Sequence, residues 1–462
     1  MTAVIFAILA VVAILAIRKP PILVGVSVSI YSFEQWAQVN SAWFVVNDTF
    51  LNLYMGVLVL AACAAVMVKG RSLFNPFPRG LIVFWSLYAF SFASIIWSIN
   101  TQQSFALVET FIPYIVATVL LTPLLISDEE DVKTAIMSIL YLGSIVTIML
   151  LLGTRVHDWG RTIVLESGPQ LTNRRGDTTD RLSPLTVAEL AGEVMMVAFL
   201  LRFRGVNKIW SMLRWVVLIV CLFQIFRSGS RGQLFAAVGV LVMFFGSSRS
   251  KSKGGQLFRG AIAMALLGGA AVIVYFSYES IVSARWNLDY MVEEYSQSRL
   301  ATSGLLMKYW ITSSPFAWFF GIGTAGSFDE RVIGFYPHII PIEILGETGF
   351  IGFAIYATTL YLAVKAWLNM MSIHADNPEK RGMVSALGAM YAFTFLLSLK
   401  QGNFLGSVNF GLFSIMLYQF EAISVRNQAK ERKKKAFWMW QQMAARSAVP
   451  QPQVQHQASV NP

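Results

Sequence analysis

Long apolar runs, one after another along the chain, constrain this sequence more than any other feature. About twelve or thirteen of them are long enough to cross a membrane, since ~20 apolar residues span the hydrocarbon core of a bilayer. The chain has 56% hydrophobic and 13% charged residues and a mean hydropathy of +0.58, so it has too few charges to cover a water-soluble surface. We therefore expect an all-α fold, a polytopic bundle of transmembrane helices over 2–17, 22–38, 50–68, 80–99, 106–126, 134–153, 184–201, 209–226, 232–247, 260–277, 341–367, 383–399 and 405–423.

The charges between the runs give this bundle a direction. When the runs are counted back from the basic C-terminal tail, four basic segments fall on the same side as that tail: 18–21, 69–71, 202–208 and 247–260. Because short loops rich in Lys and Arg stay in the cytoplasm, this side is predicted to be cytoplasmic. Two long loops, at 154–183 and 278–340, then lie on the outer side, and we expect short helices in the larger of them.

The segment 426–462 is predicted to be a cytoplasmic tail, separate from the bundle formed by 1–425. Its first part is strongly basic and contains tryptophan, so we expect it to lie on the anionic inner leaflet and to bind membrane lipids. Its Pro- and Gln-rich end is expected to be disordered. The net charge of +11 follows from this tail and the cytoplasmic loops, so it does not predict nucleic-acid binding.

Ionisable residues stand at the start of the run at 341–367, in the stretch FYPHIIPIEILGETG. Pro341 favours the first turn of a helix, which places His338 just before a helix N-terminus. Unpaired N–H groups and the positive end of the helix dipole favour an anion there. Glu343 and Glu347 follow on one face of the helix, and an unpaired carboxylate is costly inside a membrane. Both therefore predict a polar interior or a nearby cation, with structural pairing to arginines as the alternative.

Arginines gather on the outer side, against the usual bias of loop charge. Arg227 and Arg231 flank SGS between two runs, Arg299 lies near the end of the larger outer loop, and Arg181 lies in the other one. Guanidinium groups bind phosphate oxygens in pairs and keep their charge when partly dehydrated. They predict an anionic ligand; the alternatives are ion pairs with acidic residues of the same loops or contacts with lipid headgroups.

The sequence offers little to hold a metal or a nucleotide. Its four histidines and two cysteines have no metal-ligand spacing, so we expect no bound metal and no cofactor. GIGTAG, at 321–326, fits GxGxxG but follows no strand of a βαβ unit, so its glycines predict tight backbone packing in a loop. The aromatic residues of the outer loop, among them Trp310, either form an interfacial belt or stack on sugar faces.

Together these segments resemble the family of O-antigen ligases and Wzy-type polysaccharide polymerases. The resemblance rests on WSIN (97–100), SGSRGQL (228–234), SRLATSGLLMKYWITSSPFAWFFGIGTAGS (298–327) and PHIIPIEILGETGFIG (337–352). In the last of these, His338, Ile342, Glu347 and Gly349 fit the family's pattern of His, Asn, a hydrophobic residue and Glu-x-Gly. Ile339 stands where the family usually has Asn.

The resemblance implies an inverting, metal-independent glycosyltransferase in the bacterial inner membrane, with its active site facing the periplasm. The donor is a glycan on undecaprenyl diphosphate. Arg231 and Arg299 would stabilise the departing diphosphate, and His338 would bind or deprotonate the acceptor hydroxyl. Glu347 would orient His338 or position an arginine, and Arg181, Arg227, Glu343 and Trp310 are candidates for substrate contacts. Polysaccharide export proteins are possible partners.

Two questions stay open at this stage. The acceptor is either another glycan repeat, as in a polymerase, or lipid A–core, as in a ligase; we favour the polymerase because nothing in the sequence marks a lipid A–core partner. Other classes of protein also fit a helical bundle, either a flippase for lipid-linked oligosaccharides or a scaffold of an export complex. The sequence has no convincing internal repeat of the kind that transporters show, and this favours the enzyme.

Overall fold

The structure, a computed structural model, describes residues 1–73, 75–153, 163–164, 181–201, 208–249, 268 and 299–447. The expected run at 260–277, most of the two long loops and the end of the tail lie outside these residues. The expected all-α fold is confirmed, and each of the other expected runs coincides with helix.

The helices have the following bounds: α1 (Thr2–Arg18), η1 (Pro20–Ile22), α2 (Leu23–Asn40), α3 (Ala42–Val46), α4 (Phe50–Val68), α5 (Gly80–Ala93), η2 (Ser94–Trp97), α6 (Thr101–Tyr114), η3 (Ile115–Leu121), α7 (Thr122–Leu124), α8 (Glu129–Leu152), α9 (Pro184–Leu200), α10 (Lys208–Arg227), α11 (Arg231–Arg249), α15 (Ala301–Thr312), α16 (Pro315–Phe320), η5 (Gly326–Phe328), α17 (Ile340–Ile373), α18 (Pro378–Ser398) and α19 (Val408–Ser447). Two short antiparallel strands, β1 (Ile163–Val164) and β2 (Arg181–Leu182), pair with each other.

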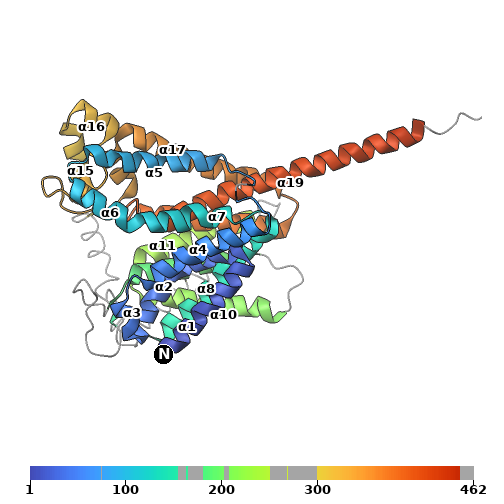
Figure 1. The fold of residues 1–462 in the computed structure, drawn as a ribbon, viewed down its shortest axis with the longest axis horizontal. Coiled ribbons are helices and arrows are strands. Elements are labelled where there is room, and N and C mark those ends of the chain that lie inside the picture. The colour runs from blue at the N-terminus through green and yellow to red at the C-terminus, as the bar shows by residue number, and fades with distance from the viewer. Residues whose placement is uncertain are drawn as a thin grey trace, which may run out of the picture.

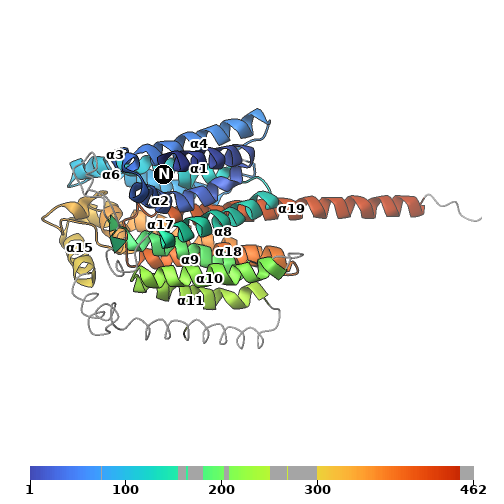
Figure 2. The ribbon, with the colours of Figure 1, turned by 90° about the horizontal axis from the view of Figure 1, so that it is seen from below.

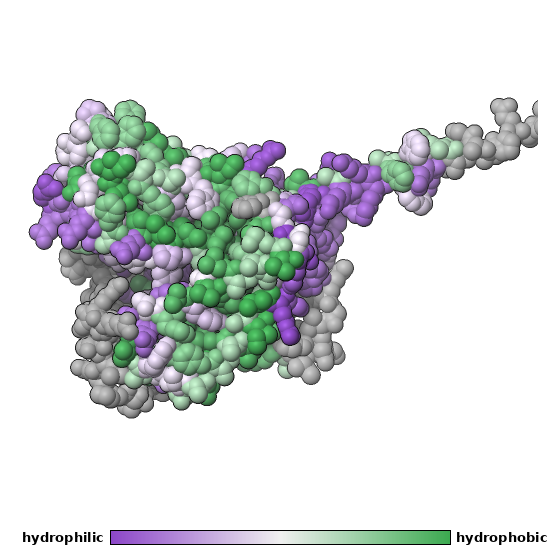
Figure 3. All heavy atoms as spheres, in the orientation of Figure 1, coloured by the Kyte–Doolittle hydropathy of each residue, from purple (hydrophilic) through white to green (hydrophobic). Residues whose placement is uncertain are grey.

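Within the described chain, 6 helical segments are long and apolar enough to cross a membrane: Phe50–Val68, Gly80–Trp97, Thr101–Leu124, Glu129–Leu152, Ile340–Ile373 and Val408–Ala444. Thr2–Arg18 and Arg231–Ser247 are shorter apolar helices. A hydrophobic band runs over these helices between two hydrophilic zones in Figure 3. The chain is a helical membrane protein; the number of crossings and the compartment at each end stay predictions.

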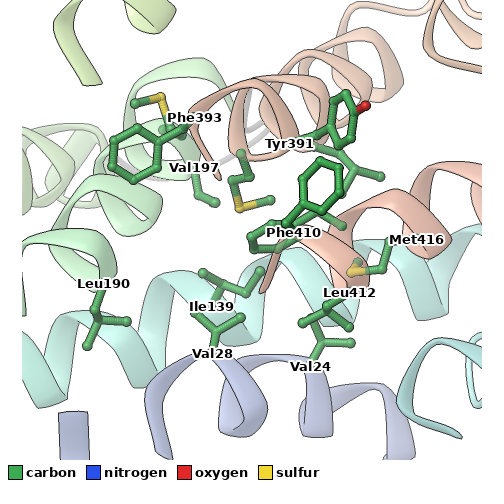
Figure 4. Close-up of a cluster of buried hydrophobic side chains, with 14 of the residues drawn as sticks. Val24, Val28, Ile139, Leu190, Val197, Tyr391, Phe393, Phe410, Leu412 and Met416 are labelled. Carbon is green, nitrogen blue, oxygen red and sulfur yellow. The ribbon is translucent and has the colours of Figure 1, made fainter. Parts of the chain in front are cut away.

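The helices pack around one large core. Figure 4 shows Val24 and Val28 of α2 facing Leu412 and Met416 of α19, with Ile139 of α8 beside them. Small residues let α2 and α8 approach closely: the Gly25 N–H donates to the Ser138 hydroxyl at 3.0 Å. Close packing through small residues is how helices associate in a membrane, where burial of apolar surface supplies no driving force between them.

The bundle has two polar ends. One carries α3, α15, α16 and the start of α6, and we call it the loop end; α19 leaves the bundle from the other, the tail end (Figure 1, Figure 2). At the tail end, polar contacts join segments that are far apart in sequence: Lys133 with Glu379, Lys380 with Glu129, Arg381 with the Ser247 carbonyl and Arg426 with the Ser127 carbonyl. One of the basic segments predicted to share a side, the one that begins at residue 247, therefore starts at this end, and the sidedness of the bundle stays a prediction.

The basic part of α19 continues as helix and runs straight out of the bundle in both views (Figure 1, Figure 2). The expectation that this segment lies on the anionic inner leaflet stays a prediction. Its large apolar side chains, including Phe437, Trp438 and Trp440, are exposed.

Candidate functional site

Glu347 organises the loop end from inside helix α17. Its Oε2 accepts a hydrogen bond from the Ala325 N–H at 2.8 Å, and its Oε1 accepts from the N–H and hydroxyl of Ser327 at 3.2 and 2.6 Å. The side chain is buried. Within the described chain it makes no ion pair with an arginine and no hydrogen bond with His338. In the structure Glu347 holds the loop at 321–327 in place, which differs from the expected role of orienting His338 or an arginine.

Glycines make this contact possible. Gly321 and Gly349 have φ of 77° and 66°, a region that suits glycine. A Cβ at Gly321 would lie 2.1 Å from the Glu347 carbonyl oxygen, and one at Gly349 would lie 2.5 Å from Gly321 N. The Ile322 N–H donates to Gly346 O at 3.0 Å across the same contact. These glycines allow tight backbone packing, which agrees with the prediction for GIGTAG.

The segment around Trp97 completes this assembly. Trp97 Nε1 donates to Phe320 O at 3.2 Å, and the hydroxyls of Ser98 and Ser104 donate to Thr324 O at 2.9 and 2.5 Å. Three of the quoted sequence segments, WSIN, GIGTAGS and LGETG, therefore meet at one place. We call residues 94–104, 321–327 and 346–349 the loop-end knot. It is a buried scaffold on which the rest of the site is built.

His338 lies just before α17, as the proline at 341 predicted. Its φ is 63°, and its ring stands edge-on to Tyr336 with centroids 4.3 Å apart. The Ser303 hydroxyl fixes the preceding turn by donating to Pro337 O at 3.0 Å. Burial, and then the positive charge of Arg299, lower the pKa of His338 below 6.5. The imidazole is therefore neutral at pH 7 and close to a guanidinium.

Lys400 joins the two arginines that the sequence singled out. It follows the end of α18, and its Nζ donates to Gln233 Oε1 on α11 at 2.8 Å. Burial is the main cause that lowers the pKa of Lys400 to about 8, and the charges of Arg299 and Arg231 lower it further. Both arginines thus act on one ammonium group. We call Arg231, Arg299 and Lys400 the cation cluster.

Lys400 was not among the expected site residues. The signal was present, because it lies between the runs at 383–399 and 405–423, in a short segment that the alternation of sides places outside. Glu343 fixes this segment: its Oε1 accepts from the Phe404 N–H at 3.1 Å. Glu343 is buried and makes this structural contact through one of its two carboxyl oxygens; its expected substrate contact stays a prediction.

Two further candidates also have structural contacts. Arg227 donates to Leu151 O at 2.7 Å, which places a cation at the C-terminal end of α8, where the helix dipole favours it. Trp310 is buried, donates from Nε1 to Ala317 O at 2.9 Å and meets the Phe350 ring edge-on. Its ring lies between α15, α16 and α17 inside the protein. Arg181 lies in β2, and its side chain is outside the described part.

A pocket of about 490 Å³ opens beside these groups. Its polar lining residues come from six helices, with two more from loops: Ser27, Tyr31, Asn52, Thr110, Tyr114, Thr118, Thr186, Glu189 and Asn409, and Tyr336 and Asn403. Asn409 Nδ2 donates to Glu189 at 3.2 Å and to Glu193 at 3.1 Å. The sequence analysis did not select these two glutamates. Their spacing of four residues in the run at 184–201 places them on one face of α9, and only the fold brings Asn409 to that face.

The described residues contain no group of three or more His, Cys, Asp or Glu that could hold a metal ion. Comparison with known proteins adds no assignment: no protein-family model matches the chain, and no curated protein matches its sequence. The resemblance to ligases and polymerases therefore stays a prediction from the segments quoted above.

Proposed function

We propose that this protein is a glycosyltransferase of the bacterial inner membrane that moves a glycan from undecaprenyl diphosphate to a hydroxyl acceptor. The loop end would carry the reaction and face the periplasm. One observation carries the proposal: the Lys400 ammonium lies against Gly232 and donates to Gln233, beside Arg231 at the start of α11. The positive charge of Arg299 lowers the pKa of both Lys400 and His338, in agreement with this grouping.

The cations suit the leaving group. When the bond between the sugar C1 and the diphosphate oxygen breaks, negative charge grows on the diphosphate. Fixed positive groups that face this charge stabilise the transition state, and they do so more strongly where water is excluded. Arg231 and Arg299 would supply this stabilisation, with guanidinium groups that can each bind two phosphate oxygens.

His338 suits the acceptor. A neutral imidazole accepts a proton, and the low pKa of His338 keeps it neutral at pH 7. The acceptor hydroxyl would give its proton to His338 while its oxygen attacks C1 from the face opposite the diphosphate. The C1–O bond to the donor breaks, the lipid diphosphate leaves with the electron pair, and the anomeric centre inverts.

The pocket beside Tyr336 has room for part of a glycan. Its volume of about 490 Å³ lies within the ~300–1,000 Å³ typical of ligand sites, and its hydroxyl and amide groups match the hydroxyls of sugars. The acceptor would be another glycan repeat, which makes the protein a polysaccharide polymerase; the alternative is lipid A–core and a ligase.

Turnover by the purified protein tests this function. Lipid-linked repeats alone should be extended by a polymerase, whereas a ligase should need added lipid A–core. We expect Arg299→Ala to lower kcat by ~100-fold or more, the size of effect seen when one transition-state donor is removed. Arg331→Ala is the matched control, because Arg331 is exposed at the same end and pairs only with Asp329 among the described residues.

Two results would overturn the proposal. One is normal turnover by both Arg231→Ala and Arg299→Ala. The other is movement of the donor across vesicles without formation of a glycosidic bond, which would favour a flippase.

A further inference from the structure

Lys400 has an unusual position for a cation. After α18 ends, the N–H groups of Lys400 and Gln401 both bond to Leu397 O, at 2.9 and 3.0 Å, and this turn sends the lysine side chain toward α11. Its ammonium lies against the backbone of Gly232, where an added Cβ would be only 2.2 Å from Nζ. Gly232 is in the first turn of α11, at the positive end of that helix.

The charges around Lys400 are out of balance. Arg231 and Arg299 both oppose its positive charge, and so does the positive end of α11. Glu189 is the acid that favours the charge, yet no carboxylate of the described chain lies within ion-pair distance of Lys400 or Arg299. Within the described part of the chain, Lys400 and Arg299 therefore carry positive charge in a half-buried place where an anionic ligand would be stabilised.

The ammonium also has hydrogen-bonding capacity to spare. An ammonium has three donors, and Gln233 Oε1 uses one of them in the described part of the protein. Gln233 is itself held in place, because its Nε2 donates to Gln401 Oε1 at 2.6 Å. Lys400 is therefore oriented by one neutral contact while its charge and two donors remain for a ligand.

We propose that Lys400 is a third substrate-binding cation of the site and donates directly to the diphosphate of a polyprenyl diphosphate. This inference rests on the proposed function and adds to it a residue that holds the anionic part of the donor. A diphosphate carries charge on two phosphorus centres, so three cations from three elements can bind it along its length. The bare backbone at Gly232 is what lets the ammonium reach this position.

Binding of farnesyl diphosphate to the purified full-length protein tests the inference, with farnesol as the uncharged control, by titration calorimetry in detergent. We expect Lys400→Met to weaken binding of the diphosphate by about tenfold, equal to about 1.4 kcal/mol, and to leave farnesol unaffected. Lys308→Met is the matched control, because Lys308 is an exposed lysine on α15 at the same end.

A second pair of variants keeps the lysine and moves it. Gly232→Ala puts a methyl group where Nζ lies, whereas Gly239→Ala on the same helix meets nothing within 4 Å. Both replace glycine by alanine in α11 and so gain the same helix propensity. We expect only Gly232→Ala to weaken binding of farnesyl diphosphate, by about threefold or more. Thermal unfolding should show that both variants are folded.

The possible outcomes separate this inference from the proposed function. If Lys400→Met and Gly232→Ala bind the diphosphate as tightly as the wild type while Arg299→Ala does not, Lys400 has no contact with the ligand and the function stands. If the wild-type protein binds farnesyl diphosphate no better than farnesol, both proposals fail together.

The charge of Lys400 gives an additional readout. Arg231 and Arg299 disfavour the protonated form of Lys400, and Glu189 favours it. The hydrogen-bond partner Gln233 is neutral. With a pKa of about 8, the ammonium loses its proton as the pH rises through 8. The ratio of wild-type to Lys400→Met affinity should therefore fall toward one between pH 7 and pH 9, and a constant ratio would contradict a role for the charge.

Discussion

Replacing Glu347 by glutamine should destabilise the protein strongly, because the carboxylate holds the loop-end knot. Glutamine keeps one oxygen and puts an NH2 group in place of the other. One of the two N–H groups, of Ala325 or Ser327, then loses its acceptor in a buried place, which costs about 1–3 kcal/mol. The remaining hydrogen bonds then have a neutral amide oxygen as acceptor in place of a carboxylate, which weakens them by about 1 kcal/mol in total. We expect a total loss of about 2–4 kcal/mol.

Unfolding in mixed micelles with rising SDS, followed by tryptophan fluorescence, measures this loss. Glu330→Gln is the matched control, since Glu330 is exposed in the same loop, and it should change stability by less than about 0.5 kcal/mol. In a double-mutant cycle, Glu347→Gln and Ser327→Ala should couple by about 1–2 kcal/mol. A Glu347→Gln protein of wild-type stability that has lost turnover would refute the argument and return Glu347 to the chemistry.

Three other predictions follow from the same geometry. Gly349→Ala should lower the midpoint of thermal unfolding by several degrees, because φ at this position is 66° and the new Cβ meets Phe319 backbone; Gly304→Ala, with nothing within 4 Å, should not. The acid limb of kcat/KM should lie below pH 6.5, since protonation removes the base His338, and Arg299→Ala should move it upward by removing a positive charge. Trp310→Phe should cost about 1 kcal/mol of stability, for the lost bond to Ala317 O, and leave donor affinity unchanged in a binding titration.

The sequence predicted the helices well because their signal is local. A run of apolar residues must form helix to satisfy its backbone in a membrane, and the described runs did so. It did not predict the breaks inside them. Pro113 and Pro123 divide the run at 106–126 into α6, η3 and α7, and Gly349 interrupts α17 because the neighbouring loop needs its positive φ.

The site was predicted less completely because it depends on contacts between distant segments. His338 could be placed from Pro341 alone, since both lie at one helix start. The role of Glu347 depends on a loop 20 residues earlier in the chain that folds back onto it. From the sequence, Trp310 could belong to an interfacial aromatic belt or stack on a sugar. Only the fold shows that its ring contacts Phe350 and its N–H donates to Ala317 O inside the protein.

The part of α19 beyond the bundle has a practical consequence for imaging this protein. At 1.5 Å per residue, the exposed helix from residue 425 to 444 reaches ~30 Å away from the helical bundle. A small rigid domain fused to it in unbroken helical register would keep a fixed orientation and stand clear of the detergent belt. Such a fiducial would give particles of a small membrane protein a recognisable shape for alignment in cryo-electron microscopy.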